Sequence, residues 1–380
     1  MTIPLPVSLN SDEIDAFGKE VDEIYEETMG SLGSKDANYI KRLVKFERIL
    51  SFCARWIIIA SVFFIPKYWT HSYVSWEGFY LIIGLGTALL SLAKILENME
   101  IGHNILHGQW DWMRDPEINS TTWEWDHACP ADQWKHSHNV THHTWTNVLG
   151  KDYDVGYGVM RISDQQKWRP RYIIQPLLNV ILALLFEWGI AIHDVNLKRL
   201  FIGNPEQIAH NKMLMKRIRQ KASRQILKDY IAWPLLSGPF FLYVLTANIV
   251  ANIVRNLWTN VIIFCGHFPK NVHVFKKADI EGETRSHWYV RQLLGSANIT
   301  GSKLFHLLTG HLSFQIEHHL FPDMPSNRYQ EVAPRVRALC QRYSLPYNTG
   351  SLARQYGTTT WKIWRLSFPG GKTTMPSYPK

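Results

Sequence analysis

Residues 136–147 read HSHNVTHHTWTN and hold four histidines in their first eight positions, although the whole chain of 380 residues has 17. His138 and His142 are four residues apart, so a helix would place both on one face, with His143 about 100° around the same helix. Neutral imidazole is the commonest protein ligand for iron, copper, zinc and nickel. The stretch therefore predicts a metal centre, and its adjacent pair of histidines could serve two neighbouring metals.

Two further histidine clusters strengthen this prediction. His103 and His107 in EIGHNILHGQWDWMRD repeat the spacing of four, and His318 and His319 are adjacent in FQIEHHLFPDMP. One metal takes about four to six ligands, and the three clusters together offer more, which favours two metals. The HExxH motif of zinc hydrolases does not occur in the sequence. Because iron activates dioxygen and can attack unactivated C–H bonds, we expect a pair of irons.

Apolar runs at residues 49–65, 78–93, 173–192 and 230–268 indicate an integral membrane protein. A membrane span needs about 20 apolar residues, so the last run is long enough for two spans, and we expect its turn at TANIVAN, residues 246–252. The 16 tryptophans suit membrane–water interfaces. His103 and His107 should then lie on a helix that continues the second span out of the membrane.

The run 173–192 is expected to lie in the membrane interface rather than to cross the bilayer. It contains Gln175, Pro176, Asn179 and Glu187. If it crossed, residues 193–229 would lie on the opposite side from the HSHNVTHH stretch, yet they carry nine Lys/Arg against three acidic residues. Basic loops stay in the cytoplasm. The sequence therefore predicts four spans in two hairpins, with both termini and all three histidine clusters in the cytoplasm.

These observations predict an all-α integral membrane fold, in which four transmembrane helices carry a cytosolic helical cap that holds a di-iron site. Its acidic N-terminal stretch is expected to be a solvated helix or a partly disordered arm. The expected division of the chain is a cytosolic arm at 1–48, a first transmembrane hairpin at 49–98, a cytosolic region with two histidine clusters at 99–229, a second hairpin at 230–268, and a cytosolic region with the third cluster at 269–380.

The order of the clusters, HNILH, HNVTHH and QIEHH, resembles the membrane fatty acid desaturase family. The third cluster has Gln315 where some branches of the family have histidine. In this it resembles the branch that contains front-end desaturases and bacterial acyl-CoA or acyl-lipid desaturases. The stretches HGQWDWMRDPEI and FQIEHHLFPDMPSNRY resemble actinobacterial-type stearoyl-CoA desaturases. The resemblance implies two non-haem irons and an oxidoreductase of fatty acid biosynthesis, which uses dioxygen to place a cis double bond in a long-chain acyl-CoA or acyl-lipid.

The resemblance also implies an eighth metal ligand, since family members carry a histidine near the cytoplasmic end of the fourth span. His267 in FCGHFP fits that place, although a histidine that caps a helix end is the alternative. No catalytic residue is expected beyond the metal ligands. The expected ligands are His103, His107, His138, His142, His143, His267, His318 and His319. Weaker candidates beside them are Gln315, His311 and His136, and possible carboxylate acceptors are Asp111, Asp115, Asp152 and Glu317. His311 lies four residues before Gln315, so a continuous helix would align it with His318.

Electrons must reach such a centre from outside the substrate. The sequence lacks the HPGG signature of a fused cytochrome b5 domain, and its four cysteines show no iron–sulfur spacing. We therefore expect an external carrier of ferredoxin or cytochrome b5 type with its reductase. Opposite charge would steer it to a basic face. That face is made of Lys212, Lys216, Arg217, Arg219, Lys221 and Arg224.

Two other functions stay open at this point. A fatty acyl hydroxylase or other oxygenase could use the same metal frame, because both reactions begin with C–H abstraction. A non-enzymatic membrane protein that binds haem or metal is the alternative from another class. Nucleic acid is not an expected partner, because the basic residues that give the net charge of +9 lie beside membrane spans. The expected location is a bacterial inner membrane.

Overall fold

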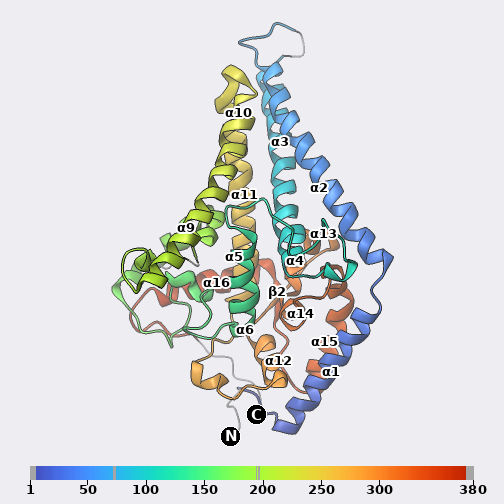
Figure 1. The fold of residues 1–380 in the computed structure, drawn as a ribbon, viewed down its shortest axis with the longest axis vertical. Coiled ribbons are helices and arrows are strands. Elements are labelled where there is room, and N and C mark those ends of the chain that lie inside the picture. The colour runs from blue at the N-terminus through green and yellow to red at the C-terminus, as the bar shows by residue number, and fades with distance from the viewer. Residues whose placement is uncertain (1–5, 72–73, 194, 196, 374–380) are drawn as a thin grey trace.

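Long helices form a stem above a helical body in the computed structural model, which describes residues 6–71, 74–193, 195 and 197–373 (Figure 1). The first hairpin of the stem consists of α2 (Ser34–Ala60) and α3 (Trp76–Leu96). In the second, α9 (Pro205–Ile226) continues through a π-helical turn into α10 (Trp233–Leu235), and α11 (Phe241–His267) returns. The two hairpins lie against each other through α3 and α11.

Two helices in the described part of the chain are long and apolar enough to cross a membrane, Trp76–Leu106 and Gly238–His267. A third span would require Pro170–Leu184 and Phe186–His193 to act together, but these two helices meet at 99°. α2 packs along α3, and the segment between α9 and α10 packs against α11, but neither α2 nor α9 is among the helices that meet this standard. The fold is therefore a mostly helical membrane protein, as the apolar runs predicted, with two or three candidate spans.

The turn expected at residues 246–252 is wrong, because α11 runs through that stretch without a break. The chain reverses earlier, around Gly238, whose φ of 58° suits glycine, and Pro239 follows it. Asn248 and Asn252, which suggested a turn, instead face the neighbouring helix. Their Nδ2 atoms donate to the backbone oxygen of Asp229 at 2.7 Å and to its Oδ2 at 3.3 Å.

The N-terminal acidic stretch is a helix, which is one of the two forms that we expected, but one face of this helix is buried and not solvated. Residues 11–30 form helix α1 (Ser11–Gly30), which Asn10 caps at its first turn. Phe17 and Val21 on one face of α1 are buried against the body. The acidic residues share the opposite face, so the helix is amphipathic and the charge pattern alone hid its apolar stripe.

The body gathers short helices around the lower end of the stem. Two three-residue strands, β1 (Asn298–Thr300) and β2 (Thr349–Ser351), pair in parallel and are a small departure from the expected all-α fold. The remaining helices are α4 (Asn104–Leu106), α5 (Ala131–Lys135), α6 (His143–Trp145), α7 (Gln175–Leu184), α8 (Phe186–His193), α12 (Arg285–Leu294), α13 (Lys303–Leu308), α14 (Gln315–Leu320), α15 (Tyr329–Arg342) and α16 (Leu352–Leu366).

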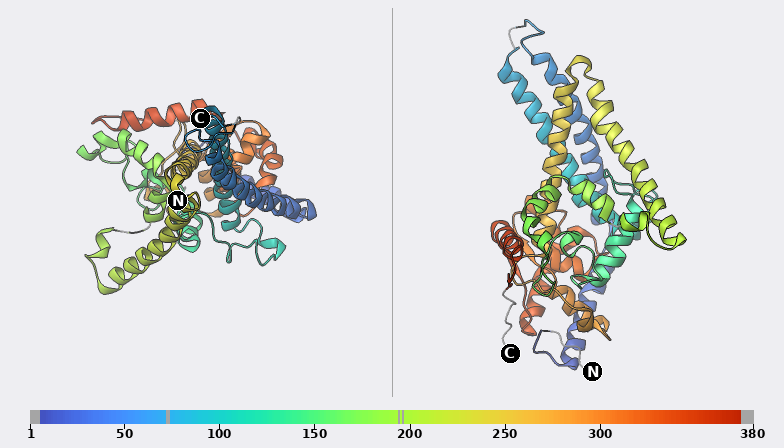
Figure 2. Two further views of the ribbon diagram at one scale, coloured as in Figure 1. Left: turned by 90° about the horizontal axis from the view of Figure 1, so that it is seen from above. Right: turned by 90° about the vertical axis from the view of Figure 1, so that its left-hand side faces the viewer.

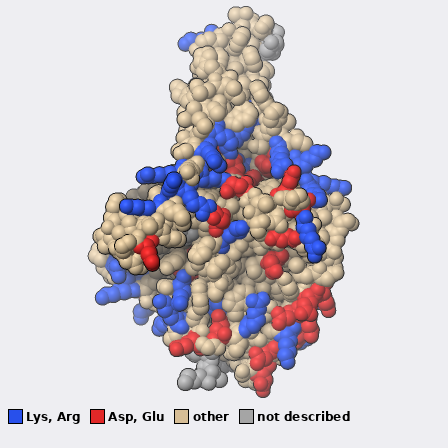
Figure 3. Space-filling model, viewed as in Figure 1, with Lys and Arg blue, Asp and Glu red and all other residues tan. Residues whose placement is uncertain are grey.

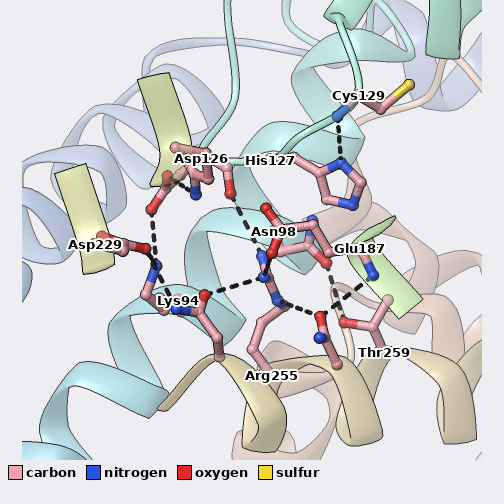
Figure 4. Close-up of polar contacts among 12 residues, drawn as sticks. Lys94, Asn98, Asp126, His127, Cys129, Glu187, Asp229, Arg255 and Thr259 are labelled. Carbon is pink, nitrogen blue, oxygen red and sulfur yellow. Dashed lines mark hydrogen bonds and ion pairs between the residues drawn. The ribbon is translucent and has the colours of Figure 1, made fainter. Parts of the chain in front are cut away.

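Buried ion pairs tie the hairpins together where the stem meets the body (Figure 4). The Asp229 carboxylate lies 2.6 Å from Lys94 Nζ and 2.8 Å from Arg55 Nη2, so one residue joins α2, α3 and the turn after α9. Arg255 of α11 pairs with Glu187 of α8. Buried charges of this kind are stable only when paired. In the space-filling view, the Lys, Arg, Asp and Glu residues gather on the lower part of the molecule, and the upper stem carries almost none (Figure 3).

Candidate metal centre

Two segments of π-helix position the first two histidine clusters. α3 continues beyond Leu96 as the π-helix Glu97–His103, and the second cluster lies in the π-helix His136–His142 that follows α5. π-helical turns are rare and concentrate at functional sites. Both clusters therefore lie on helices, as expected, but these helices are π-helices, whose turns are wider than those of the α-helix that the spacing of four suggested.

Histidine side chains from five helical segments converge into two groups. In each group the candidate ligand atoms lie within 4.8 Å of one another. The first group consists of His103, His107, His138 and His318, and the second consists of His142, His267 and His319. His143 lies between the groups, with its ring centroid 4.7 Å from that of His107 and 4.4 Å from that of His319. All eight histidines expected as ligands thus lie together.

Most of these rings keep a buried nitrogen that has no hydrogen-bond partner. An unpaired buried polar atom is costly, so native proteins leave few of them. Their concentration at one place is what a metal centre requires, because the lone pair is then available to a cation. The unpartnered atoms are Nε2 of His107, His138, His142, His318 and His319, Nδ1 of His267, and both ring nitrogens of His143.

Burial keeps most of these imidazoles neutral. Desolvation lowers the pKa of His143, His318 and His319 well below the ordinary value, and the neighbouring histidines lower it further. His142 differs. Burial again disfavours its charged form, but the carboxylates of Asp152 and Asp154 outweigh burial and raise its pKa. A neutral imidazole is the form that binds a metal, so His143, His318 and His319 can bind without first losing a proton, whereas His142 is the ring that holds a proton more readily.

Contacts from outside the clusters orient the rings. His103 Nδ1 lies 2.8 Å from Asn104 Oδ1, and His319 Nδ1 lies 3.0 Å from Gln292 Oε1. When the Nδ1–H donates in this way, Nε2 is left for a metal, which is the usual arrangement around metal-binding histidines. Asn104 and Gln292 were not expected from the sequence, and nothing in their local pattern indicates the role.

Of the four carboxylates considered, only Asp152 contacts a candidate ligand, with its Oδ2 3.0 Å from His142 Nδ1. The other three bond elsewhere. Asp111 accepts from Ser120, Asp115 pairs with Lys41, and Glu317 accepts from Asn298 and Tyr347. Asp154 was not expected from the sequence, yet its Oδ2 lies 3.5 Å from His142 Nδ1 and 3.8 Å from His138 Nδ1.

The three weaker candidates lie in different surroundings. Gln315 Nε2 is 3.0 Å from His267 Nε2, so it touches the second group. His311 Nδ1 is 2.8 Å from Glu100 Oε2. The continuous helix that would align His311 with His318 is wrong, because His311 has a φ of 54° and separates α13 from α14. His136 is exposed.

An apolar cavity adjoins both groups of histidines. Its walls combine His103, His138 and His267 with Phe186 and Ile263. His127 and His193 also line it, although the sequence suggested no role for either. The volume of this cavity is about 50 Å³, and Asp154 and Gln315 also line it, so the histidines lie beside a small space that has room for only a few carbon atoms.

Comparison with known proteins gives a consistent result. The sequence profile of the family described as "Fatty acid desaturase" matches residues 75–351. An NADPH-dependent stearoyl-CoA 9-desaturase of Mycobacterium tuberculosis (strain ATCC 25618 / H37Rv) is 43% identical over 365 residues, which cover 95% of this chain and 82% of the relative. An sn-1 linoleoyl-lipid 6-desaturase of Synechocystis sp. is 24% identical over 277 residues, covering 69% of this chain and 74% of that protein.

Proposed function

We propose, since this chain belongs to the fatty acid desaturase family, that it places a cis double bond in a long-chain acyl-CoA in a reaction that consumes dioxygen. One observation carries the proposal. Two groups of buried histidines with unpartnered ring nitrogens lie side by side against an apolar cavity. The geometry joins a site for two metals to a small cavity of about 50 Å³, which would hold the few carbon atoms of the alkyl chain that react.

The donor set fits two non-haem irons. His103, His107, His138 and His318 would hold one iron and His142, His267 and His319 the other, with His143 between them. When bound, the irons supply the activation of dioxygen that removes two hydrogens from the chain. The protein's own part is to orient the imidazoles, to exclude water and to fix which carbon lies nearest the metals.

We assign a second pocket to the head group of the substrate. A solvent-open pocket of about 790 Å³ lies beside the apolar cavity, and Trp125 lines both. Four cations and five carboxylates line the open pocket; Lys221 and Lys228 pair with two of the carboxylates, which leaves Arg48 and Arg224 as the cations for a phosphate. We infer that the reacting part of the alkyl chain lies in the cavity while the phosphate-bearing head group lies in the pocket. The name of the mycobacterial relative, a stearoyl-CoA desaturase, agrees with this choice.

The proposed topology keeps four spans in two hairpins, with the metal centre and both termini in the cytoplasm of a bacterial cell. The two apolar helices Trp76–Leu106 and Gly238–His267 support one span in each hairpin. We propose that residues 49–98 and 230–268 form the hairpins, and that 1–48, 99–229 and 269–380 form the cytosolic part. The 99° bend between α7 and α8 supports an interfacial helix at 173–192.

The reaction requires an electron donor. Removing two hydrogens from the chain supplies two electrons, and dioxygen needs four to become two waters, so two electrons and two protons come from elsewhere. We propose a separate carrier of ferredoxin or cytochrome b5 type, reduced at the expense of NADPH. The mycobacterial relative is named as NADPH-dependent, which supports the final source. Exposed Lys212, Lys216 and Arg219 on α9 would receive an acidic carrier.

The decisive experiment analyses products and metal together. A host that expresses the chain should gain a monounsaturated acyl chain, whose double bond mass spectrometry locates. Purified protein should contain two irons per chain. An alcohol in place of the alkene would identify a hydroxylase on the same frame, and a haem absorbance band without turnover would identify a binding protein.

His267 and His136 make a matched pair of variants for the ligand set. His267 is buried among the other rings, whereas His136 is exposed beside the second cluster. His267→Ala should lose iron and activity, and His136→Ala should keep both. If His267→Ala retains full iron and most activity, His267 is a helix cap and not a ligand.

A further inference from the structure

Helix α16 (Leu352–Leu366) lies outside the family match, which ends at residue 351. It packs where the long helix α11 ends, with Ile363 buried against Phe264 and Phe268. Lys362 Nζ donates to the backbone oxygen of Pro269 at 2.9 Å. Seen along the stem, α16 runs across it and not along it (Figure 2, left). A helix in that direction would lie parallel to a membrane that the stem crosses.

Large aromatic side chains cover the outer surface of α16. Tyr356, Trp361, Trp364 and Phe368 are 43%, 61%, 46% and 42% exposed. Tyr356, Thr360 and Trp364 are spaced by four and share one face, and the rings of Trp361 and Trp364 stack at 4.9 Å. Three exposed aromatic residues on one short helix, with Phe368 two residues beyond its end, are unusual for a surface in water, and tryptophan and tyrosine are enriched at membrane interfaces.

Basic residues border this aromatic surface. Lys270, Lys362, Arg365 and Lys372 line a cavity of about 180 Å³, and Trp361 forms another part of its wall. No carboxylate belongs to the described residues that line it, and the nearby Asp164 accepts a hydrogen bond from Thr373. Aromatic side chains beside such a cluster of cations are typical of helices that lie on anionic membranes.

The surface continues from α16 onto α7. Gln175 Nε2 of α7 donates to the backbone oxygen of Ile363 at 2.6 Å, so the two helices are joined. Leu177 and Val180 on α7, and Ile174 just before it, are exposed. The helix that is expected in the membrane interface therefore lies next to the helix that carries the aromatic residues.

We propose that α16 lies in the head-group layer of the cytoplasmic leaflet, where its aromatic residues enter the interface and its basic residues bind the phosphates of anionic phospholipids. The charge favours this occupant, since a second copy would bring the same four cations against one another. Binding would hold the lower end of α11, and with it His267, at a fixed depth. This assignment goes beyond the desaturase reaction and does not depend on turnover.

A spin label on α16 tests the depth directly. In full-length protein with Cys53→Ser, which removes the exposed cysteine, a nitroxide is placed at Thr360→Cys or, as control, at Glu23→Cys on α1. The protein is held in nanodiscs of zwitterionic lipid or of zwitterionic lipid with phosphatidylglycerol. We expect the ratio of oxygen to nickel-chelate accessibility to be several-fold higher at residue 360 than at residue 23, and to rise with phosphatidylglycerol.

Charge-removing variants separate the contribution of the basic residues to membrane binding from that of the aromatic residues. Lys270→Gln, Arg365→Gln and Lys372→Gln together should abolish the rise with phosphatidylglycerol, while Lys212→Gln, Lys216→Gln and Arg219→Gln on α9 should leave it intact. A label at 360 that is no deeper than the label at 23 overturns the proposal. A deep label that ignores phosphatidylglycerol and the first triple variant overturns the phospholipid assignment, and dipolar broadening that grows with the number of chains per disc would assign α16 to a second copy instead.

Discussion

Asp152 Oδ2 lies 3.0 Å from His142 Nδ1 and also accepts the backbone N–H of Asn147 at 2.8 Å. The carboxylate is therefore fixed before it meets the imidazole. It orients the ring so that Nε2, which has no hydrogen-bond partner, faces the other histidines of its group. A carboxylate behind a metal-binding histidine raises the basicity of the ligand and selects its tautomer.

Asp152→Asn is expected to weaken metal binding without unfolding the protein. The amide keeps the shape but removes the charge behind His142, and losses of this kind cost about 10–100-fold in metal affinity. Iron affinity is measured by competition with a chelator, with Asp111→Asn as control because that carboxylate bonds Ser120. Equal iron affinity in both variants would contradict the role given to Asp152.

The histidine clusters could be predicted from the sequence because each is local. Spacings of four bring His103 to His107 and His138 to His142 on any helix, whatever the rest of the fold does. What joins the clusters is not local. Gln292 and Asp154 contact histidines through tertiary packing, and their neighbours in sequence give no sign of it.

The errors have a similar physical origin. Asn248 and Asn252 were read as turn residues, although inside a helix their amides can bond across to a buried carboxylate. The continuous helix through His311 failed because a left-handed residue cannot be seen in a periodic pattern. The N-terminal helix was expected to be solvated because its charges are plain in the sequence, whereas the apolar stripe that buries one face appears only at helical spacing.

Gly266→Ala should disturb the second group of histidines through Gln315. A Cβ at position 266 would lie 2.9 Å from Cγ and Cδ of Gln315, and Gln315 is the residue that contacts His267. Such overpacking costs about 1–3 kcal/mol, so we expect a lower Tm and reduced iron content. Gly84→Ala is the control, because a Cβ there meets nothing within 4 Å. An unchanged Tm and iron content for Gly266→Ala would show that Gln315 can move freely.

Acid should destabilise the protein through His273, which lies outside the ligand set. Burial, and to a lesser extent Lys362, lowers the pKa of His273 to about 4. The unfolded state then binds the proton more readily than the folded state, so stability is complete above the ordinary pKa of about 6.5 and falls as the pH drops from there towards 4. His273→Gln should flatten the dependence of Tm on pH across this window, and an equally steep dependence in the variant would assign it to other groups.

Arg224 should contribute to binding of the substrate's head group. It lines the solvent-open pocket that meets the apolar cavity at Trp125. Loss of one charged hydrogen bond to a phosphate at such an exposed place should raise KM for acyl-CoA by up to about tenfold, with kcat and the double-bond position unchanged. Arg42→Gln is the matched variant, since Arg42 on α2 is exposed outside this pocket and outside the basic surface of α9. A KM that rises equally in both variants would reflect general charge and not a head-group site.

The basic surface of α9 should control how fast electrons arrive. Lys212 and Lys216 are exposed on this helix, and small electron carriers are commonly acidic, so opposite charges would steer the encounter. Salt screens this attraction, because the Debye length falls to about 10 Å at 0.1 M salt. With carrier and reductase supplied, turnover should fall as salt rises, and Lys212→Glu with Lys216→Glu should lower the carrier-limited rate at low salt and remove the salt dependence. Lys19→Glu with Lys35→Glu makes the same change of charge on the N-terminal helices, where both side chains are exposed, and should leave both properties intact.

Turnover with NADPH and no second protein would refute the need for a carrier. A carrier-supported rate that does not respond to salt in the unmodified chain would refute the docking on α9 and leave the carrier itself in place.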